Sequence, residues 1–129
     1  MKTAELSVFI IEDDARFRET FMDVMALRGV DVRGAGTGAE ALRSLQALQP
    51  SVIVCDVQLP DVHGFDLVRK IRRIESLKDT PLIFLSASTQ YSDPRDRAEG
   101  LLAGASSFLP KPIKIDKLWA EIDRLIHKN

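Results

Sequence analysis

The chain has 129 residues, which suits one domain with a single hydrophobic core. Hydrophobic residues make up 45% of the sequence and charged residues 29%, and the formal net charge is -1. This balance provides no overall basic field to attract nucleic acid or an anionic membrane. No apolar run approaches the ~20 residues that a membrane-spanning helix needs. We therefore expect neither direct nucleic-acid binding nor membrane association.

The N-terminus and the cysteine content favour the cytoplasm. Residues 1–5 lead directly into a short apolar run without the pattern of a signal peptide. Cys55 is the only cysteine, so an internal disulfide is impossible and a reducing compartment fits. Because Cys55 stands within an apolar run, we expect a small buried hydrophobe rather than a reactive thiol. A cytoplasmic location is the resulting prediction.

Strand and helix patterns alternate along the chain. Short apolar or alternating runs predict strands at residues 6–11, 30–33, 52–56, 81–85 and 105–109. Apolar residues at three- and four-residue spacing predict helices from Phe17 to Met25, Ala41 to Leu48, Leu67 to Ile74, Ala98 to Leu102 and Ile115 to Ile126.

Several helix ends carry recognisable signals. Asp14 is expected to cap the first helix, and Thr37 and Glu40 form a capping box for the second. Pro50 is expected to close that second helix. Asp93 precedes a proline, as an N-cap before Pro at the first helical position does.

Five strands alternating with five helices predict an α/β domain with right-handed crossovers. Such connections produce a parallel sheet covered by helices on both faces. In open sheets of this kind, ligands bind beyond the carboxyl ends of the strands, where the strand order reverses. The residues at those ends are therefore the candidates for function.

Polar side chains follow four of the five predicted strands. Glu12 and Asp13 follow the first, Asp56 ends the third, Ser86 follows the fourth and Lys111 follows the fifth. Neighbouring strands lie ~4.8 Å apart, so Asp13 and Asp56 would share one cation if the first and third strands are neighbours. Carboxylate oxygens suit Mg²⁺, and a hydroxyl with an ammonium suits the oxygens of a phosphoryl group. The set favours phosphoryl transfer.

The chain resembles response-regulator receiver domains of the chemotaxis-regulator type along essentially its whole length. The likeness rests on residues at the strand ends, in this order: Glu12-Asp13, Asp56 with Pro60 and Gly64 four and eight residues on, Ser86-Ala87, and Lys111-Pro112. It implies a flavodoxin-like, doubly wound fold. Its parallel sheet would have five strands in the order 2-1-3-4-5, flanked by five helices.

The resemblance also implies a phosphoacceptor switch rather than a metabolic enzyme. Asp56 would take a phosphoryl group from the phosphohistidine of a sensor histidine kinase or a histidine phosphotransfer protein. Asp13 would bind Mg²⁺ directly and Glu12 mainly through water. The backbone carbonyl of Gln58 would be a further ligand.

Three more residues receive roles from the resemblance. Ser86 would hydrogen-bond the phosphoryl group, Lys111 would pair with it, and Phe108 would turn inward as an aromatic switch. The surface of the fourth helix, fifth strand and fifth helix would then change shape for a downstream effector domain or protein.

Some positions depart from the family pattern. Three extra residues fall around Thr89 to Pro94. Ser106-Ser107 and Glu121 stand where receivers of the winged-helix class usually carry two acids and an arginine, so we expect no dimer of that class. Lys114 is a weak cap for the last helix. Residues 1–129 read as one receiver domain with no effector domain, either stand-alone or part of a longer regulator.

Two alternatives remain open at this point. Gly34, Gly36 and Ala39 match a dinucleotide-binding fingerprint, and Asp56 follows about 20 residues later. A small NAD-binding oxidoreductase domain is therefore the second hypothesis, although its preceding strand carries charges and the chain is short. The third is a degenerate receiver that acts only as a binding module.

Overall fold

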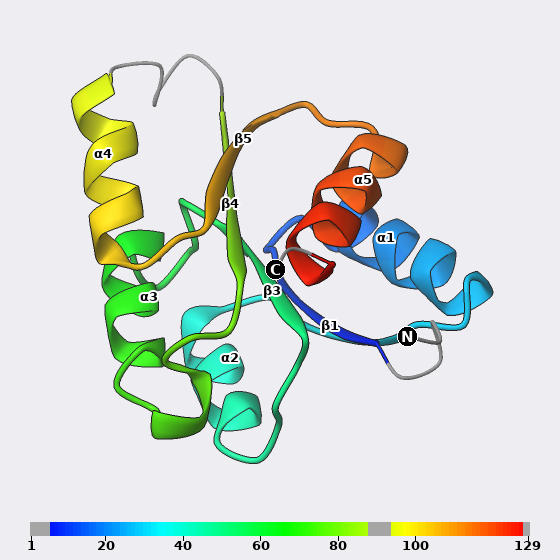
Figure 1. The fold of residues 1–129 in the computed structure, drawn as a ribbon, viewed down its shortest axis with the longest axis horizontal. Coiled ribbons are helices and arrows are strands. Elements are labelled where there is room, and N and C mark those ends of the chain that lie inside the picture. Colours follow the sequence, from blue (N-terminus) through cyan, green and yellow to red (C-terminus); the bar gives the residue numbers. More distant parts are fainter. Residues whose placement is uncertain (1–5, 88–93, 128–129) are drawn as a thin grey trace.

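The computed structural model describes residues 6–87 and 94–127 and contains one parallel sheet with helices on both faces (Figure 1). The strand order is β2-β1-β3-β4-β5, and every neighbouring pair is parallel. The predicted fold class and strand order are confirmed. The elements are β1 (Ser7–Ile11), α1 (Ala15–Leu27), β2 (Asp31–Ala35), α2 (Gly38–Leu45), β3 (Val52–Asp56), α3 (Gly64–Ile71), the 3₁₀ helix η2 (Glu75–Leu77), β4 (Leu82–Ala87), α4 (Pro94–Ala103), β5 (Ser107–Lys111) and α5 (Ile115–Ile126).

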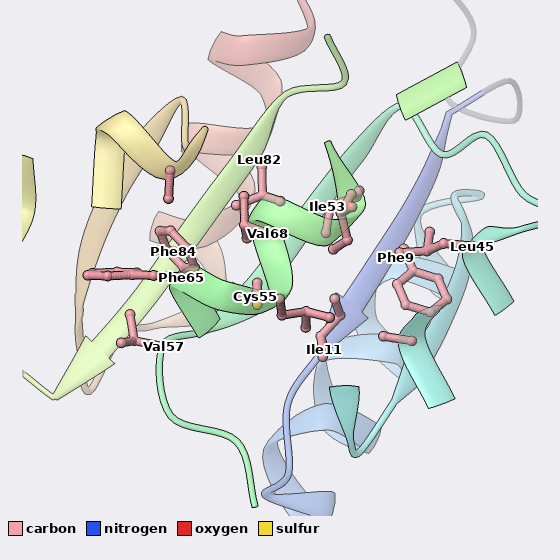
Figure 2. Close-up of a cluster of buried hydrophobic side chains, with 14 of the residues drawn as sticks. Phe9, Ile11, Leu45, Ile53, Cys55, Val57, Phe65, Val68, Leu82 and Phe84 are labelled. Atoms are coloured by element: carbon pink, nitrogen blue, oxygen red, sulfur yellow. The ribbon is translucent and has the colours of Figure 1, made fainter. Parts of the chain in front are cut away.

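Two hydrophobic clusters fill the space between the sheet and its helices. Helices α1 and α5 cover one face, and α2, α3 and α4 cover the other (Figure 1). Along β3, Ile53 and Cys55 belong to the cluster drawn in Figure 2, while Val52 and Val54 belong to the opposite one. Side chains alternate along a strand, so a strand between two helical layers must be apolar throughout. All five residues of β3 are buried, as predicted.

The predicted caps of helices α1 and α2 are confirmed. The carboxylate of Asp14 accepts hydrogen bonds from two amides in the first turn of α1, at 3.0 and 3.2 Å. The Thr37 hydroxyl accepts from the Glu40 amide at 3.1 Å, and the Glu40 carboxylate accepts from the Gly36 amide at 3.0 Å. Lys114 makes no side-chain capping bond to α5, as expected from a weak cap.

Strand β5 lies two residues later than predicted, at Ser107–Lys111 rather than 105–109. Pro110 inside the strand misled the sequence pattern, because proline cannot donate to a sheet. Strand β5 lies at the edge of the sheet and pairs only with β4. On its other side no strand needs a hydrogen bond from the Pro110 nitrogen, so a proline is tolerated there. Lys111 is consequently the last residue of the strand rather than a residue of the loop beyond it.

Two helices end earlier than predicted. Helix α2 ends at Leu45, well before Pro50, because the chain turns back to the sheet, where the Ser51 amide donates to the Ser7 carbonyl at 2.7 Å. Helix α3 ends at Ile71 and is followed by η2, which the sequence analysis did not predict.

Helix α4 begins at Pro94, as predicted, and buries Gly100 and Ala103 rather than its leucines. The predicted Asp93 cap and most of the extended loop from Thr89 to Pro94 lie outside the described residues. In the described parts of the chain, no helix is long and apolar enough to cross a membrane.

Candidate functional site

The three acids predicted at the strand ends come together. Strands β1 and β3 are neighbours with Ile11 opposite Cys55, so the residues that follow β1 lie beside the end of β3. Glu12, Asp13 and Asp56 each offer a carboxylate oxygen, and these oxygens lie within 4.8 Å of one another. The sheet topology therefore forms the acidic cluster.

A cavity of about 380 Å³ opens at this cluster. The carboxyl ends of β3, β4 and β5 and the loop after β3 form most of its wall, lined by Asp13, Asp56, Val57, Gln58, Leu59, Pro60, Ser86, Ala87 and Lys111. All the predicted site residues except Glu12 and Phe108 line it. Glu12 is 1% exposed and does not line the cavity.

Lys111 connects two of the acids. Its ammonium nitrogen lies 2.8 Å from Oε1 of Glu12 and 3.3 Å from Oδ2 of Asp56. Partial burial alone would lower the pKa of Lys111, but its hydrogen bonds and attraction to the two carboxylates raise the pKa above its usual value. Lys111 therefore stays protonated at neutral pH.

The two buried acids hold protons more tightly than usual. Burial is the main cause that raises the pKa of Glu12 to about 7, with the charge of Asp56 adding and the Lys111 hydrogen bond opposing. Burial also raises the pKa of Asp56 above its ordinary value, against the attraction of Lys111. Burial therefore favours the protonated form of both acids unless a further cation compensates their charge.

The donor set fits a divalent cation. Three carboxylates and one ammonium leave two formal negative charges at the cluster when all four groups are ionised. Carboxylate and carbonyl oxygens are the ligands that Mg²⁺ takes in proteins, usually from one or two carboxylates together with water. Asp13 is exposed, so one side of the cluster is open to solvent.

The loop after β3, residues 57–63, is a compact turn. The Gly64 amide donates to the Val57 carbonyl at 2.5 Å, and Gln58 forms an antiparallel bridge with His63. A Cβ atom on Gly64 would lie 2.7 Å from the Asp56 carbonyl oxygen, so only glycine fits there. This explains physically why a glycine stands eight residues after Asp56.

The two predicted switch residues are both buried. Ser86, in β4, is 3% exposed and lines the cavity. Phe108, in β5, is 5% exposed, and its ring centroid lies 6.3 Å from that of Phe65 and 5.7 Å from that of Phe84. The inward position predicted for the switched state is the one observed here, and the movement of the ring stays a prediction.

The glycines of the dinucleotide fingerprint face side chains of the protein itself. A Cβ atom on Gly34 would lie 3.0 Å from the Met22 sulfur, and one on Gly36 would lie 3.1 Å from the Arg18 guanidinium. The amides of Gly38 and Ala39, which would bind a pyrophosphate, donate to a carboxylate of the chain at 2.8 and 3.0 Å. These contacts leave neither the glycines nor the two amides available to a pyrophosphate, and they argue against the NAD hypothesis.

Three residues near the site were missed by the sequence analysis. Asp61 supplies the carboxylate just described, Arg18 donates to the Glu12 carbonyl at 2.5 Å, and His63 caps α3 through its Nδ1. The contacts of Asp61 and Arg18 join different parts of the chain, so no short sequence pattern predicts them. Histidine is not among the usual N-cap residues, so the His63 cap had no clear signal in the sequence.

The comparisons with known proteins agree with this site. The family profile described as "Response regulator receiver domain" matches residues 8–123. The transcriptional regulatory protein GltR of Pseudomonas aeruginosa is 36% identical over 122 residues, which cover 95% of this chain and 49% of GltR. The chain spans about half the length of the curated relatives it matches.

Solved structures show the same fold. The non-phosphorylated HemR receiver domain of Leptospira biflexa has a TM-score of 0.86 and 30% identity, covering 97% of both chains. The receiver domain of the sensor histidine kinase PA1611 of Pseudomonas aeruginosa PAO1, with a magnesium ion coordinated in its active site cleft, has a TM-score of 0.81 and 27% identity, covering 94% of this chain and 97% of that chain. The acidic pocket, the fold and the family profile agree, and the chain belongs to the response regulator receiver domains of two-component signalling, which are phosphoacceptors rather than metabolic enzymes.

Proposed function

We propose that Asp56 accepts a phosphoryl group from a phosphohistidine on a sensor histidine kinase or a histidine phosphotransfer protein, in a reaction that needs Mg²⁺. The observation that carries this proposal is the convergence of Glu12, Asp13 and Asp56, whose carboxylate oxygens lie within 4.8 Å of one another. The ammonium of Lys111 contacts two of these acids, Glu12 and Asp56. The magnesium-bound relative supports the choice of metal.

The transfer requires little covalent chemistry from the protein. An Asp56 carboxylate oxygen attacks the phosphorus, the bond from phosphorus to the histidine nitrogen breaks, and its electron pair stays on the imidazole. Catalysis then consists mainly of positioning and charge neutralisation. Asp13, Asp56 and the Gln58 carbonyl would hold Mg²⁺, with Glu12 behind them, and the ion would neutralise charge on the phosphoryl oxygens.

Lys111 and Ser86 would bind the remaining oxygens of the phosphoryl group. Lys111 already lies 3.3 Å from Asp56, so it needs only a short movement from Glu12 toward a group attached there. Ser86 lines the same cavity and would donate its hydroxyl proton. Hydrogen bonds to ionised acceptors are the strong class, so both residues favour the phosphorylated state.

The output would lie on the surface of α4, β5 and α5. Phosphorylation replaces about one negative charge with about two and adds acceptor oxygens. Ser86 would follow these oxygens, and the packing of Phe108 would respond, changing the surface offered to an effector domain or protein. The two acids and the arginine of a winged-helix-class dimer are replaced by Ser106, Ser107 and Glu121, and Glu121 accepts hydrogen bonds from Arg124 within α5.

The test is phosphorylation of the purified domain with acetyl phosphate and Mg²⁺, followed by intact mass measurement. We expect one added phosphoryl group in the parent domain and none in Asp56→Asn or in EDTA. Asp14→Asn is the matched control and should be phosphorylated like the parent, because Asp14 only caps α1 and asparagine caps equally well. A parent domain that takes up no phosphate would instead support the degenerate receiver.

A further inference from the structure

The carboxylate of Asp61 joins the loop after β3 to the first turn of α2. Its Oδ1 accepts a hydrogen bond from the Gly38 amide at 2.8 Å, and its Oδ2 accepts one from the Ala39 amide at 3.0 Å. These two bonds are the main cause that lowers the pKa of Asp61. The side chain is therefore ionised at neutral pH, where the partial positive charge at the helix N-terminus also favours it.

Asp61 stands at the tip of a loop whose near side forms the phosphorylation site. Gln58, Leu59 and Pro60 all line the cavity beside Asp56, and the loop closes through the bridge between Gln58 and His63. Within the loop, the Leu59 amide donates to Val62 at a long 3.3 Å. The tip is held weakly by its own bonds, so its attachment to α2 matters for its position.

Two kinds of contact attach the tip of the loop to helix α2. In the described parts of the chain, the hydrogen bonds that tie residues 59–62 to another element are those of Asp61. Beside them, the Val62 side chain packs against Gly38, whose lack of a Cβ atom allows that close approach. A carboxylate fixed at both oxygens restrains the loop in orientation as well as in distance.

We propose that Asp61 is a positioning residue for phosphoryl transfer, because it fixes the loop that presents the Gln58 carbonyl to Mg²⁺. This inference rests on the proposed function. Asp61 does not line the cavity at Asp56, so it would act through the loop and not by direct contact with the metal or the phosphoryl group. Partners that orient metal ligands from behind typically change metal affinity by about 10–100-fold when removed.

A second cap on the same helix separates positioning from simple stability. Thr37 also caps α2, through the Glu40 amide at 3.1 Å, but it makes no bond to the loop. Thr37→Ala and Asp61→Ala should both destabilise α2, since each removes a capping acceptor. A loss of Mg²⁺ binding confined to Asp61→Ala would therefore report on the loop.

The experiment measures Mg²⁺ binding by isothermal titration calorimetry in the parent, Asp61→Ala, Asp61→Asn and Thr37→Ala, with the melting temperature of each. We expect Asp61→Ala to raise the Mg²⁺ dissociation constant roughly tenfold, with Thr37→Ala at the parent value. Asp61→Asn keeps one acceptor oxygen and should fall between. With acetyl phosphate, Asp61→Ala should need more Mg²⁺ for half-maximal labelling yet approach the parent rate at saturation.

Two results would overturn the inference while leaving the proposed function intact. One is an Asp61→Ala domain that binds Mg²⁺ as tightly as an active parent. The other is a Thr37→Ala domain that loses as much Mg²⁺ affinity as Asp61→Ala, which would reduce the effect to helix stability. A parent domain that binds no Mg²⁺ and takes up no phosphate would overturn the proposed function, and this inference with it.

Discussion

At the scale of single residues, Glu12 is a buried carboxylate whose ionised form is energetically unfavourable. The side chain is 1% exposed and lies beside Asp56, with Lys111 as its cationic partner. Burying a carboxylate is costly unless it is paired or protonated. The raised pKa of Glu12 is the measurable sign of that cost.

The pH dependence of stability should reveal it. Between the ordinary value of 4.5 and the folded value of about 7, the folded domain binds more protons at Glu12 than the unfolded chain does. The free energy of unfolding should therefore fall as pH rises through this window, by on the order of 2 kcal/mol from this group. Urea unfolding in EDTA at pH 5 and at pH 8 measures the difference.

Glu12→Gln is the control for this prediction. The amide cannot ionise, so the fall in stability between pH 5 and pH 8 should largely disappear in the variant. A variant that retains the full pH dependence would show that another group is responsible. Added Mg²⁺ should stabilise the parent most at the higher pH, because metal binding favours deprotonated ligands.

At the scale of elements, the junction between β3 and α3 depends on one glycine. A Cβ atom at Gly64 would meet three backbone atoms of Asp56 and Val57 at 2.7 to 2.9 Å. Backbone atoms in a strand end cannot move aside as a flexible side chain does. The sequence position of Gly64 is therefore fixed by the close approach of the loop to β3.

Substituting this glycine should destabilise the domain. We expect Gly64→Ala to lower the free energy of unfolding by ~1–3 kcal/mol, the usual cost of overpacking. Gly36→Ala is the matched control, because its Cβ atom would meet side-chain atoms rather than backbone, the nearest being a guanidinium nitrogen of Arg18 at 3.1 Å. Urea denaturation checks both variants. Equal losses from the two substitutions would contradict the steric explanation.

The elements also show what local sequence patterns can predict. The run from Val52 to Asp56 predicted a strand buried on both faces, and Thr37 predicted a helix start, because both signals depend on the residues themselves. The start of β5 was misplaced because Pro110 was read as lying outside the strand, whereas an edge strand tolerates a proline. The buried face of α4 was not recognised, since Gly100 faces the core only because the rings of Phe65 and Phe108 come close to it.

The site shows the same division. Glu12, Asp13, Asp56, Ser86 and Lys111 were predicted because each follows or ends an apolar run at the same edge of a parallel sheet. Asp61 was not, because its partners are 22 and 23 residues away and the contact exists only in the folded chain. Sequence spacing predicts which residues lie at the same edge of the sheet. It does not predict which side chains form hydrogen bonds between distant parts of the chain.

At the scale of the whole molecule, the sheet joins the acidic cluster to a distant surface. Strands β4 and β5 pair from Ile83 opposite Ser107 to Ala87 opposite Lys111, so the site and the Phe108 packing lie on one pair of strands. A change at Asp56 therefore has a direct structural connection to β5 and its flanking helices. Because the chain spans about half the length of its curated relatives, what receives that change stays a proposal.

The central claim is that Asp56 itself is the phosphoacceptor. Reduction of the phosphorylated domain with borohydride converts an acyl phosphate on aspartate to homoserine, and peptide mass spectrometry then locates the changed residue. We predict homoserine at position 56 only, dependent on both acetyl phosphate and Mg²⁺. Conversion at Asp13 or Asp14, or persistent labelling of Asp56→Asn, would contradict the account.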